Sequence, residues 1–169
     1  EVPIAPLATA AELMVPLELP PREVKRIARL NGVLRALVPG RIEMFRFEGL
    51  AAAKNVEKRA AGVTVKLEQV RKNNMLREVR IRVGYDEPAG SMASHRTWMF
   101  DNEAYLEGPD GKKVRYDAFE TTWQSENEFG IAYLFGLEEP LDKYAFVYKT
   151  PGRILANDFR YEIGDVALP

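Results

Sequence analysis

The sequence contains no cysteine and only one histidine, His95. Without cysteine the chain has no disulfide bonds, no thiolate zinc ligands and no thiol nucleophile. A zinc site built from histidine and cysteine is excluded as well, because one imidazole cannot assemble it. We expect no metal site and no cofactor.

An excess of charge of one sign and a long apolar run are also missing. The 24 basic and 25 acidic residues give a formal net charge of −1. Such a balance provides no field that attracts nucleic acid. No stretch approaches the roughly 18 apolar residues of a membrane-spanning helix. We expect neither a nucleic-acid partner nor a transmembrane segment.

A serine-hydrolase constellation is not recognisable either. His95 follows Ser94 directly, and neighbouring side chains in an extended segment point to opposite faces. The sequence has no Gly-X-Ser-X-Gly nucleophile elbow and no glycine-rich phosphate loop. We interpret His95 as a loop residue and expect no catalytic residues.

Two sets of acidic residues leave two weaker alternatives open, glycoside hydrolysis and calcium binding. Glu120, Glu126 and Glu128 flank Trp123 in the sequence, and paired carboxylates support glycoside hydrolysis. The oxygen ligands of a calcium site can come from acidic and amide residues of two loops. That second group is Asp86, Glu87, Asp101, Asn102 and Glu103.

The sequence does contain a series of short segments in which apolar and polar residues alternate. Hydrophobic residues make up 46% and charged residues 29%, which suffices for one buried core. The clearest pair is 63–68 and 79–85, with apolar residues at every second position and Asn73-Asn74 between them as a hairpin signal. Gly108-Pro109-Asp110-Gly111 is a strong turn signal.

The N-terminal part is harder to interpret. Residues 1–12 are expected to be a tail or linker, and 13–19 an edge strand because Pro16 cannot donate to a central ladder. Residues 22–38 fit a helical stripe or a strand, and we favour a strand. A strand is predicted at 42–50, and 49–61 is expected to be a small-residue connector.

About ten strands at this spacing predict an all-β fold, an Ig-like antiparallel β-sandwich with additional N-terminal strands. Long helices between the strands are missing, which argues against a doubly wound fold. The expected division is 1–12 as tail, 13–61 as N-terminal strands packed on the sandwich, and 62–169 as the sandwich.

Residues 62–150 resemble the small Ig-like sandwich domains, of unknown function, of secreted and envelope-associated bacterial proteins. The resemblance rests on GVTVKLEQV, EVRIRVGYD, AYLEGPDGKKV and GIAYLFGLEEPLDKYAFVYKTPG, and on the final FRYEIGDVALP. It implies an extracytoplasmic, non-enzymatic domain, periplasmic or secreted, and it carries over no functional residues.

Aromatic residues are the best indication of function. Trp98, Tyr116 and Trp123 gather in one region with polar neighbours, and such a platform binds carbohydrate or a partner protein by stacking. Tryptophans of sandwiches also occur in the core. We expect a monomeric, non-catalytic binding or accessory domain whose partner is an envelope protein or a carbohydrate. The alternatives are a structural spacer in a larger envelope protein and a weak glycoside hydrolase.

Overall fold

The computed structural model describes residues 12–18, 20–86, 102–125, 127–137, 139–152 and 154–168. Within this part the chain forms antiparallel strands and a short 3-10 helix, η2 (Leu141–Lys143), and no α-helix. Contacts between Cα atoms divide the chain into two compact units, Glu1–Ala36 with Ala156–Pro169, and Leu37–Leu155. The expected all-β sandwich is confirmed, and it lies in the second unit.

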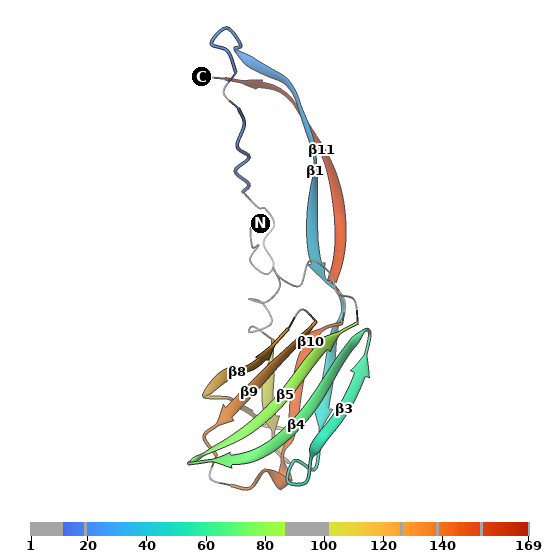
Figure 1. Ribbon diagram of the computed structural model, residues 1–169, viewed down its shortest axis with the longest axis vertical. Coiled ribbons are helices and arrows are strands. Elements are labelled where there is room, and N and C mark those ends of the chain that lie inside the picture. Colours follow the sequence, from blue (N-terminus) through green and yellow to red (C-terminus); the bar gives the residue numbers. More distant parts are fainter. Residues whose placement is uncertain are drawn as a thin grey trace. The chain divides into compact units, whose positions relative to one another are not determined.

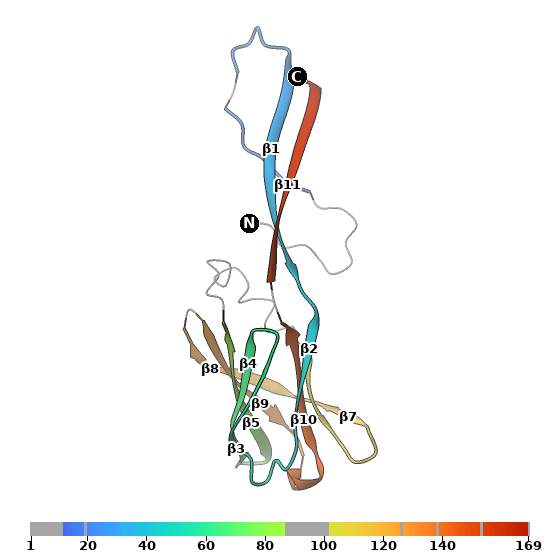
Figure 2. The ribbon, with the colours of Figure 1, turned by 90° about the vertical axis from the view of Figure 1, so that its right-hand side faces the viewer.

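The strands follow one another along the chain as β1 (Arg26–Pro39), β2 (Ile42–Phe47), β3 (Lys54–Ala60), β4 (Val63–Asn73), β5 (Leu76–Tyr85), β6 (Ala104–Glu107), β7 (Lys113–Arg115), β8 (Ala118–Gln124), β9 (Glu128–Phe135), β10 (Ala145–Pro151) and β11 (Ile154–Ala167). The sandwich consists of a four-stranded sheet, β2-β10-β6-β7, and a five-stranded sheet, β3-β4-β5-β9-β8. β1 and β11 form a separate two-stranded ribbon. Figures 1 and 2 show the two layers of the sandwich from perpendicular directions.

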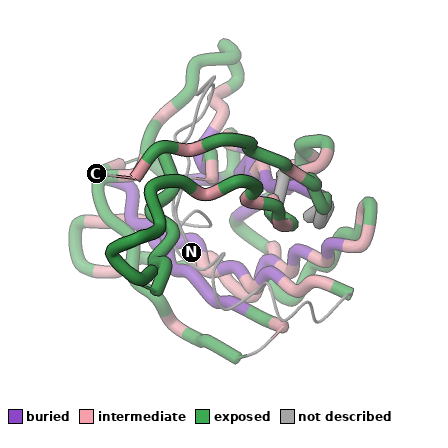
Figure 3. Tube along the Cα trace, turned by 90° about the horizontal axis from the view of Figure 1, so that it is seen from above, coloured by how far each residue is buried: buried purple, intermediate pink, exposed green. Residues whose placement is uncertain are grey.

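The core lies between the two sheets and is rich in aromatic residues. The ring of Tyr133 on β9 lies 5.8 Å from that of Phe146 on β10, so the contact joins the two layers. Phe47 of β2 and Phe135 of β9 also pack against Phe146. In Figure 3 buried and intermediate positions alternate along part of the chain, as they do in the first half of β4 and in much of β5. The period-2 patterns of the sequence therefore predict this core correctly.

The predicted hairpin is present as β4 and β5. Its turn consists of Asn74 and Met75, because Asn73 pairs with Leu76. Asn74 has a φ of 55°, a left-handed conformation that asparagine adopts more readily than most residues. The hairpin signal in the sequence is confirmed, one residue further along than expected.

A β-bulge divides β4 into two halves. Val65 and Leu67 are fully buried, so odd-numbered residues face the core in the first half. The register shifts between Leu67 and Gln69, and after this bulge Val70 lies opposite the buried Val79. Even-numbered residues therefore face the core in the second half, as expected when one extra residue enters a strand.

Two expectations for the N-terminal part are wrong. Residues 49–61 are not only a connector, because β3 occupies Lys54–Ala60 as the edge of the five-stranded sheet. Most of its residues are exposed, so the strand has no apolar alternation that the sequence would reveal. The expected edge strand at 13–19 is also absent for residues 13–18, which have no ladder partner in the described structure.

The ribbon of β1 and β11 confirms the strand interpretation of residues 22–38. Its two faces differ in character. A Cβ atom on Gly32 would lie 2.5 Å from the hydroxyl oxygen of Tyr161, so the Tyr161 ring covers Gly32 on one face. By the period of 2, this face also carries the apolar residues Leu30, Leu34, Phe159 and Ile163, with Arg26, Asn157 and Asp165 towards its ends. Ion pairs such as Arg35–Asp158, at 2.9 Å, lie on the opposite face.

Candidate functional site

The candidate site lies on the outer face of the five-stranded sheet, at Trp123 of β8. Phe119 and Thr121 lie opposite the buried Tyr133 and Ile131 of β9, so odd-numbered residues at the start of β8 belong to the core side. The register then shifts between Thr121 and Trp123. This bulge turns Trp123 to the outer face, where 46% of its surface is exposed. Bulges commonly re-aim a side chain beside a functional site.

Gly130 provides the space that this arrangement needs. Trp123 pairs with Gly130 of β9, and a Cβ atom on Gly130 would lie 2.8 Å from the Cβ atom of Trp123 and 2.7 Å from the hydroxyl oxygen of Thr122. Real Cβ atoms do not approach so closely, so only glycine is compatible with the Trp123 backbone at this point. The bulge and the glycine together fix the position of the indole.

A guanidinium group and two carboxylates complete the site. Arg82 of β5 also pairs with Gly130, and its Cζ atom lies 5.0 Å from the centre of the Trp123 ring. Its Nε atom donates to Glu68 at 2.8 Å, and a second guanidinium nitrogen lies 3.6 Å from Glu128. We call the group of Glu68, Arg82, Glu128, Gly130 and Trp123 the Trp123 platform. It combines an accessible ring with fixed hydrogen-bonding groups.

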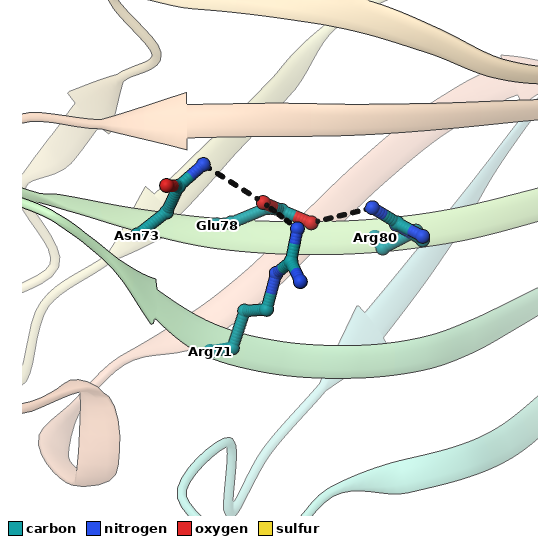
Figure 4. A network of polar contacts seen from close by, with 4 residues as sticks. All are labelled: Arg71, Asn73, Glu78 and Arg80. Atoms are coloured by element: carbon teal, nitrogen blue, oxygen red, sulfur yellow. Dashed lines mark hydrogen bonds and ion pairs between the residues drawn. The ribbon is translucent and has the colours of Figure 1, made fainter.

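A second polar cluster on the same face surrounds Glu78 and is shown in Figure 4. Glu78 is 2% exposed, and its carboxylate accepts hydrogen bonds from Arg71 (2.9 Å), Asn73 (3.1 Å) and Arg80 (2.9 Å). Burial alone would raise the pKa of Glu78, but the hydrogen bonds and charges of Arg71 and Arg80 outweigh burial and lower it. Its hydrogen-bonding capacity is already used, so this cluster stabilises the sheet rather than offering a binding site.

The opposite outer face of the sandwich also combines an aromatic ring with cations. The ammonium groups of Lys113 and Lys149 lie 4.4 and 5.7 Å from the centre of the Tyr105 ring, and both bind Glu103, at 2.7 and 2.6 Å. These hydrogen bonds hold the pKa of Glu103 below its ordinary value. Tyr105 is only 6% exposed. A ring covered in this way cannot stack on a ligand, in contrast to Trp123.

A buried polar network joins the two sheets. Tyr85 of β5 shares a hydrogen bond with Thr150 of β10 at 2.8 Å, and the Asn102 amide donates to Tyr148 at 2.8 Å and to Thr150 at 3.0 Å. Burial raises the pKa of both phenols, Tyr85 and Tyr148. The partners are internal, which indicates a structural role.

One cavity of about 410 Å³ opens between loops at an end of the sandwich. Its charged residues already pair with each other, since Arg46 forms ion pairs with Glu48 and Glu107. Asp142 and Lys143 bring one further charge of each sign to the lining. The lining therefore has one more acidic than basic residue, and its arginine is already paired with two glutamates.

The sequence-predicted aromatic residues do not form one platform in the described structure. Tyr116 packs towards the core, with its ring 5.0 Å from Tyr133 and 5.9 Å from Phe119. Trp123 lies on the outer face of the five-stranded sheet, away from the core that Tyr116 contacts. Trp98 lies outside the described residues, as does His95. The platform residues that the sequence did not single out are Glu68, Arg82 and Gly130. They are revealed by strand pairing, because Gly130 of β9 pairs with both Arg82 and Trp123, and by the hydrogen bond from Arg82 to Glu68.

The carboxylates of the two alternative sites are separated. Glu120 lies opposite Ala132, and Glu128 lies opposite Gly84 at the far end of β9, while Glu126 is outside the described residues. Of the candidate calcium ligands, Asp86 pairs with Arg59 at 2.5 Å, and Glu87 and Asp101 are outside the described part. Within that part, no group of three or more histidine or acidic residues is arranged to hold a metal ion.

Comparison with protein-family models, with curated proteins and with solved structures gives no match for this chain. None of the described residues belongs to a helix long and apolar enough to cross a membrane. The geometry of the Trp123 platform is therefore the feature of the molecule that bears on its function.

Proposed function

We propose that this chain is a non-catalytic binding domain that holds a carbohydrate of the cell envelope against Trp123. The observation that carries the proposal is the outward-facing, half-exposed indole, which a bulge and a glycine hold in place. Large aromatic side chains in cores are covered, and this one is not. The proposal includes the extracytoplasmic location that the sequence resemblance implies, which cell fractionation tests.

The chemistry of the platform favours a sugar over an apolar ligand. The apolar face of a pyranose ring stacks on an indole, while its hydroxyl groups need donors and acceptors at the rim. Arg82 uses only part of its five N–H donors on Glu68 and Glu128, and each carboxylate has further acceptor positions, so the three groups retain capacity for hydroxyl groups. The exposed position at a sheet edge leaves room for an extended oligosaccharide.

The experiment is a thermal-shift panel of soluble oligosaccharides and cell-wall fragments, followed by calorimetric titration of each ligand that raises the melting temperature. A ligand present at 100 times its dissociation constant adds about 2.7 kcal/mol of stability. Trp123→Ala should weaken binding about fivefold or more, because aromatic stacking contributes about 1 kcal/mol beyond buried area. Trp123→Phe should retain part of the affinity.

Met75→Ala is the matched control, because Met75 is a 79% exposed apolar residue in the β4–β5 turn, outside the platform. Its affinity should equal that of the parent protein. Trp98→Ala is measured in parallel, since the sequence also predicts a contact there. Equal affinity of Trp123→Ala and the parent protein would overturn the proposal. A panel in which no sugar raises the melting temperature would favour a structural spacer.

A further inference from the structure

The ribbon of β1 and β11 has features of an incomplete sheet. A two-stranded ribbon is at best marginally stable in water, whereas three or more strands with an apolar face are stable. No residue of the ribbon whose burial is described is buried, and Phe159 and Ile163 are 54% and 48% exposed. Among the described residues the sheet contains only these two strands, so in that part of the chain the backbone N–H and C=O groups of both outer edges have no ladder partner. The backbone groups along these edges are therefore available for pairing with further strands.

The two strands that form the outer edges of the ribbon, β1 and β11, carry different sets of charged residues. β1 carries Arg26, Arg29 and Arg35 and no acidic residue. Two copies of β1 would therefore bring only like charges together, which is destabilising. β11 carries a mixed set, namely Asp158, Arg160, Glu162 and Asp165. Only the β11 edge can be complementary to itself.

We propose that two copies of this chain pair through β11, antiparallel and about a two-fold axis at Tyr161. In this register Arg160 lies opposite Glu162 of the second copy, and by symmetry the opposite-charge pair occurs twice. Phe159 lies opposite Ile163 of the second copy on the apolar face, because directly opposed residues share a face. Tyr161 stands next to the midpoint of the strand Ile154–Ala167, so nearly the whole edge is used.

The pairing would provide an acidic partner for one arginine of the ribbon. Arg160 is exposed and forms no salt bridge with any described residue, while the other ribbon arginines Arg26, Arg29 and Arg35 each have an acidic partner on the opposite strand. The product is a four-stranded sheet, β1-β11 followed by β11-β1 of the second copy. One of its faces is more apolar than the other, and three or more strands with a hydrophobic face are what independent stability requires. This inference departs from the monomer expected from the sequence.

Sedimentation of the full chain over a range of concentrations tests the proposal. The parent protein should form a dimer. Arg160→Glu alone and Glu162→Arg alone should each raise the dissociation constant about tenfold or more, because each places like charges opposite each other twice. An equimolar mixture of the two variants should form a heterodimer, in which both pairs are again of opposite charge. Circular dichroism of each variant verifies that the strands remain folded.

A cross-link tests the register. The chain has no cysteine, so Tyr161→Cys introduces a single thiol. Opposed residues of antiparallel strands have Cα atoms about 4.5–5.5 Å apart, within the range of a disulfide. Tyr161→Cys should therefore oxidise to a covalent dimer. Phe159→Cys is the control. In the proposed register, the two introduced thiols at position 159 lie four residues apart along the strands, about 13 Å, which is too far for a disulfide.

Each result bears on the pairing. A parent protein that stays monomeric up to about 1 mM, where binding would be weaker than about 4 kcal/mol, overturns the proposal. A dimer whose dissociation constant is unchanged in both charge variants also overturns it, and then the ribbon edge is open to a different protein. Equal cross-linking at positions 159 and 161 contradicts the register.

Discussion

The Glu78 cluster allows a quantitative prediction for Glu78→Gln. This change keeps the shape of the side chain and removes its charge, leaving Arg71 and Arg80 without their carboxylate. Breaking a fully buried ion pair costs about 3–5 kcal/mol. The side chains of Arg71 and Arg80 are 50% and 29% exposed, so water compensates part of this loss. We expect the free energy of unfolding to fall by about 2 kcal/mol at pH 7.

The effect should depend on pH in a defined direction. The pKa of Glu78 is lowered in the folded protein, so its ionised form contributes stability above the unfolded pKa, about 4.3. This contribution is lost as the pH falls through the lower folded pKa. The difference between the parent protein and Glu78→Gln should therefore be constant above about pH 5 and shrink progressively below pH 4.

Urea denaturation followed by circular dichroism, at pH 7 and at several values below pH 4, measures both quantities. Glu48→Gln is the matched control, since Glu48 pairs with Arg46 at 3.0 Å while its side chain is 74% exposed. Such a surface pair contributes at most about 1 kcal/mol. A Glu78→Gln effect no larger than that of Glu48→Gln, or one that is the same at every pH, would refute the reasoning.

Two further predictions concern the backbone and the core. Ala61 has a φ of 46° in the turn before Gly62. Ala61→Gly should raise the free energy of unfolding by about 0.5 kcal/mol, because the backbone strain that is relieved exceeds the added entropy of the unfolded chain. An unchanged or lower urea midpoint would contradict this. Phe146→Ala should lower it by about 3–5 kcal/mol, because Phe146 is fully buried and contacts rings from both sheets; a loss below 1 kcal/mol in the same assay would show that the core closes around the gap.

The sequence predicted the strands whose two faces differ and missed those whose faces are alike. β4 and β5 alternate clearly, because one face is buried and the other is charged. β3 is exposed on both sides, and its residues therefore resemble a loop in composition. In β1, residues spaced for a helix also fit a strand, and the choice depended on β11, which is more than 100 residues further along the chain.

For the candidate site, residue type was predictable and orientation was not. Trp123 stands out in the sequence, but the direction of its indole depends on a bulge within Thr121-Thr122-Trp123 that no periodicity reveals. The alternation of β5 places Glu78, Arg80 and Arg82 on one face. Their partners Arg71 and Glu68 come from β4, whose faces exchange at the bulge.

That exchange of faces in β4 has a consequence for how the chain tolerates changes of length. Val63 to Leu67 are in phase with the turn at Ala61-Gly62, and Val70 to Asn73 are in phase with the turn at Asn74-Met75. Glu68 is the extra residue between these two halves of β4, and it has no directly opposed residue on β5. Losing this one residue would leave composition and hydropathy almost unchanged. It would remove the bulge and restore an uninterrupted alternation, in which Leu67 and Val70 are second neighbours and both still face the core. At the bulge, β4 can therefore lose one residue without exchanging its buried and exposed faces.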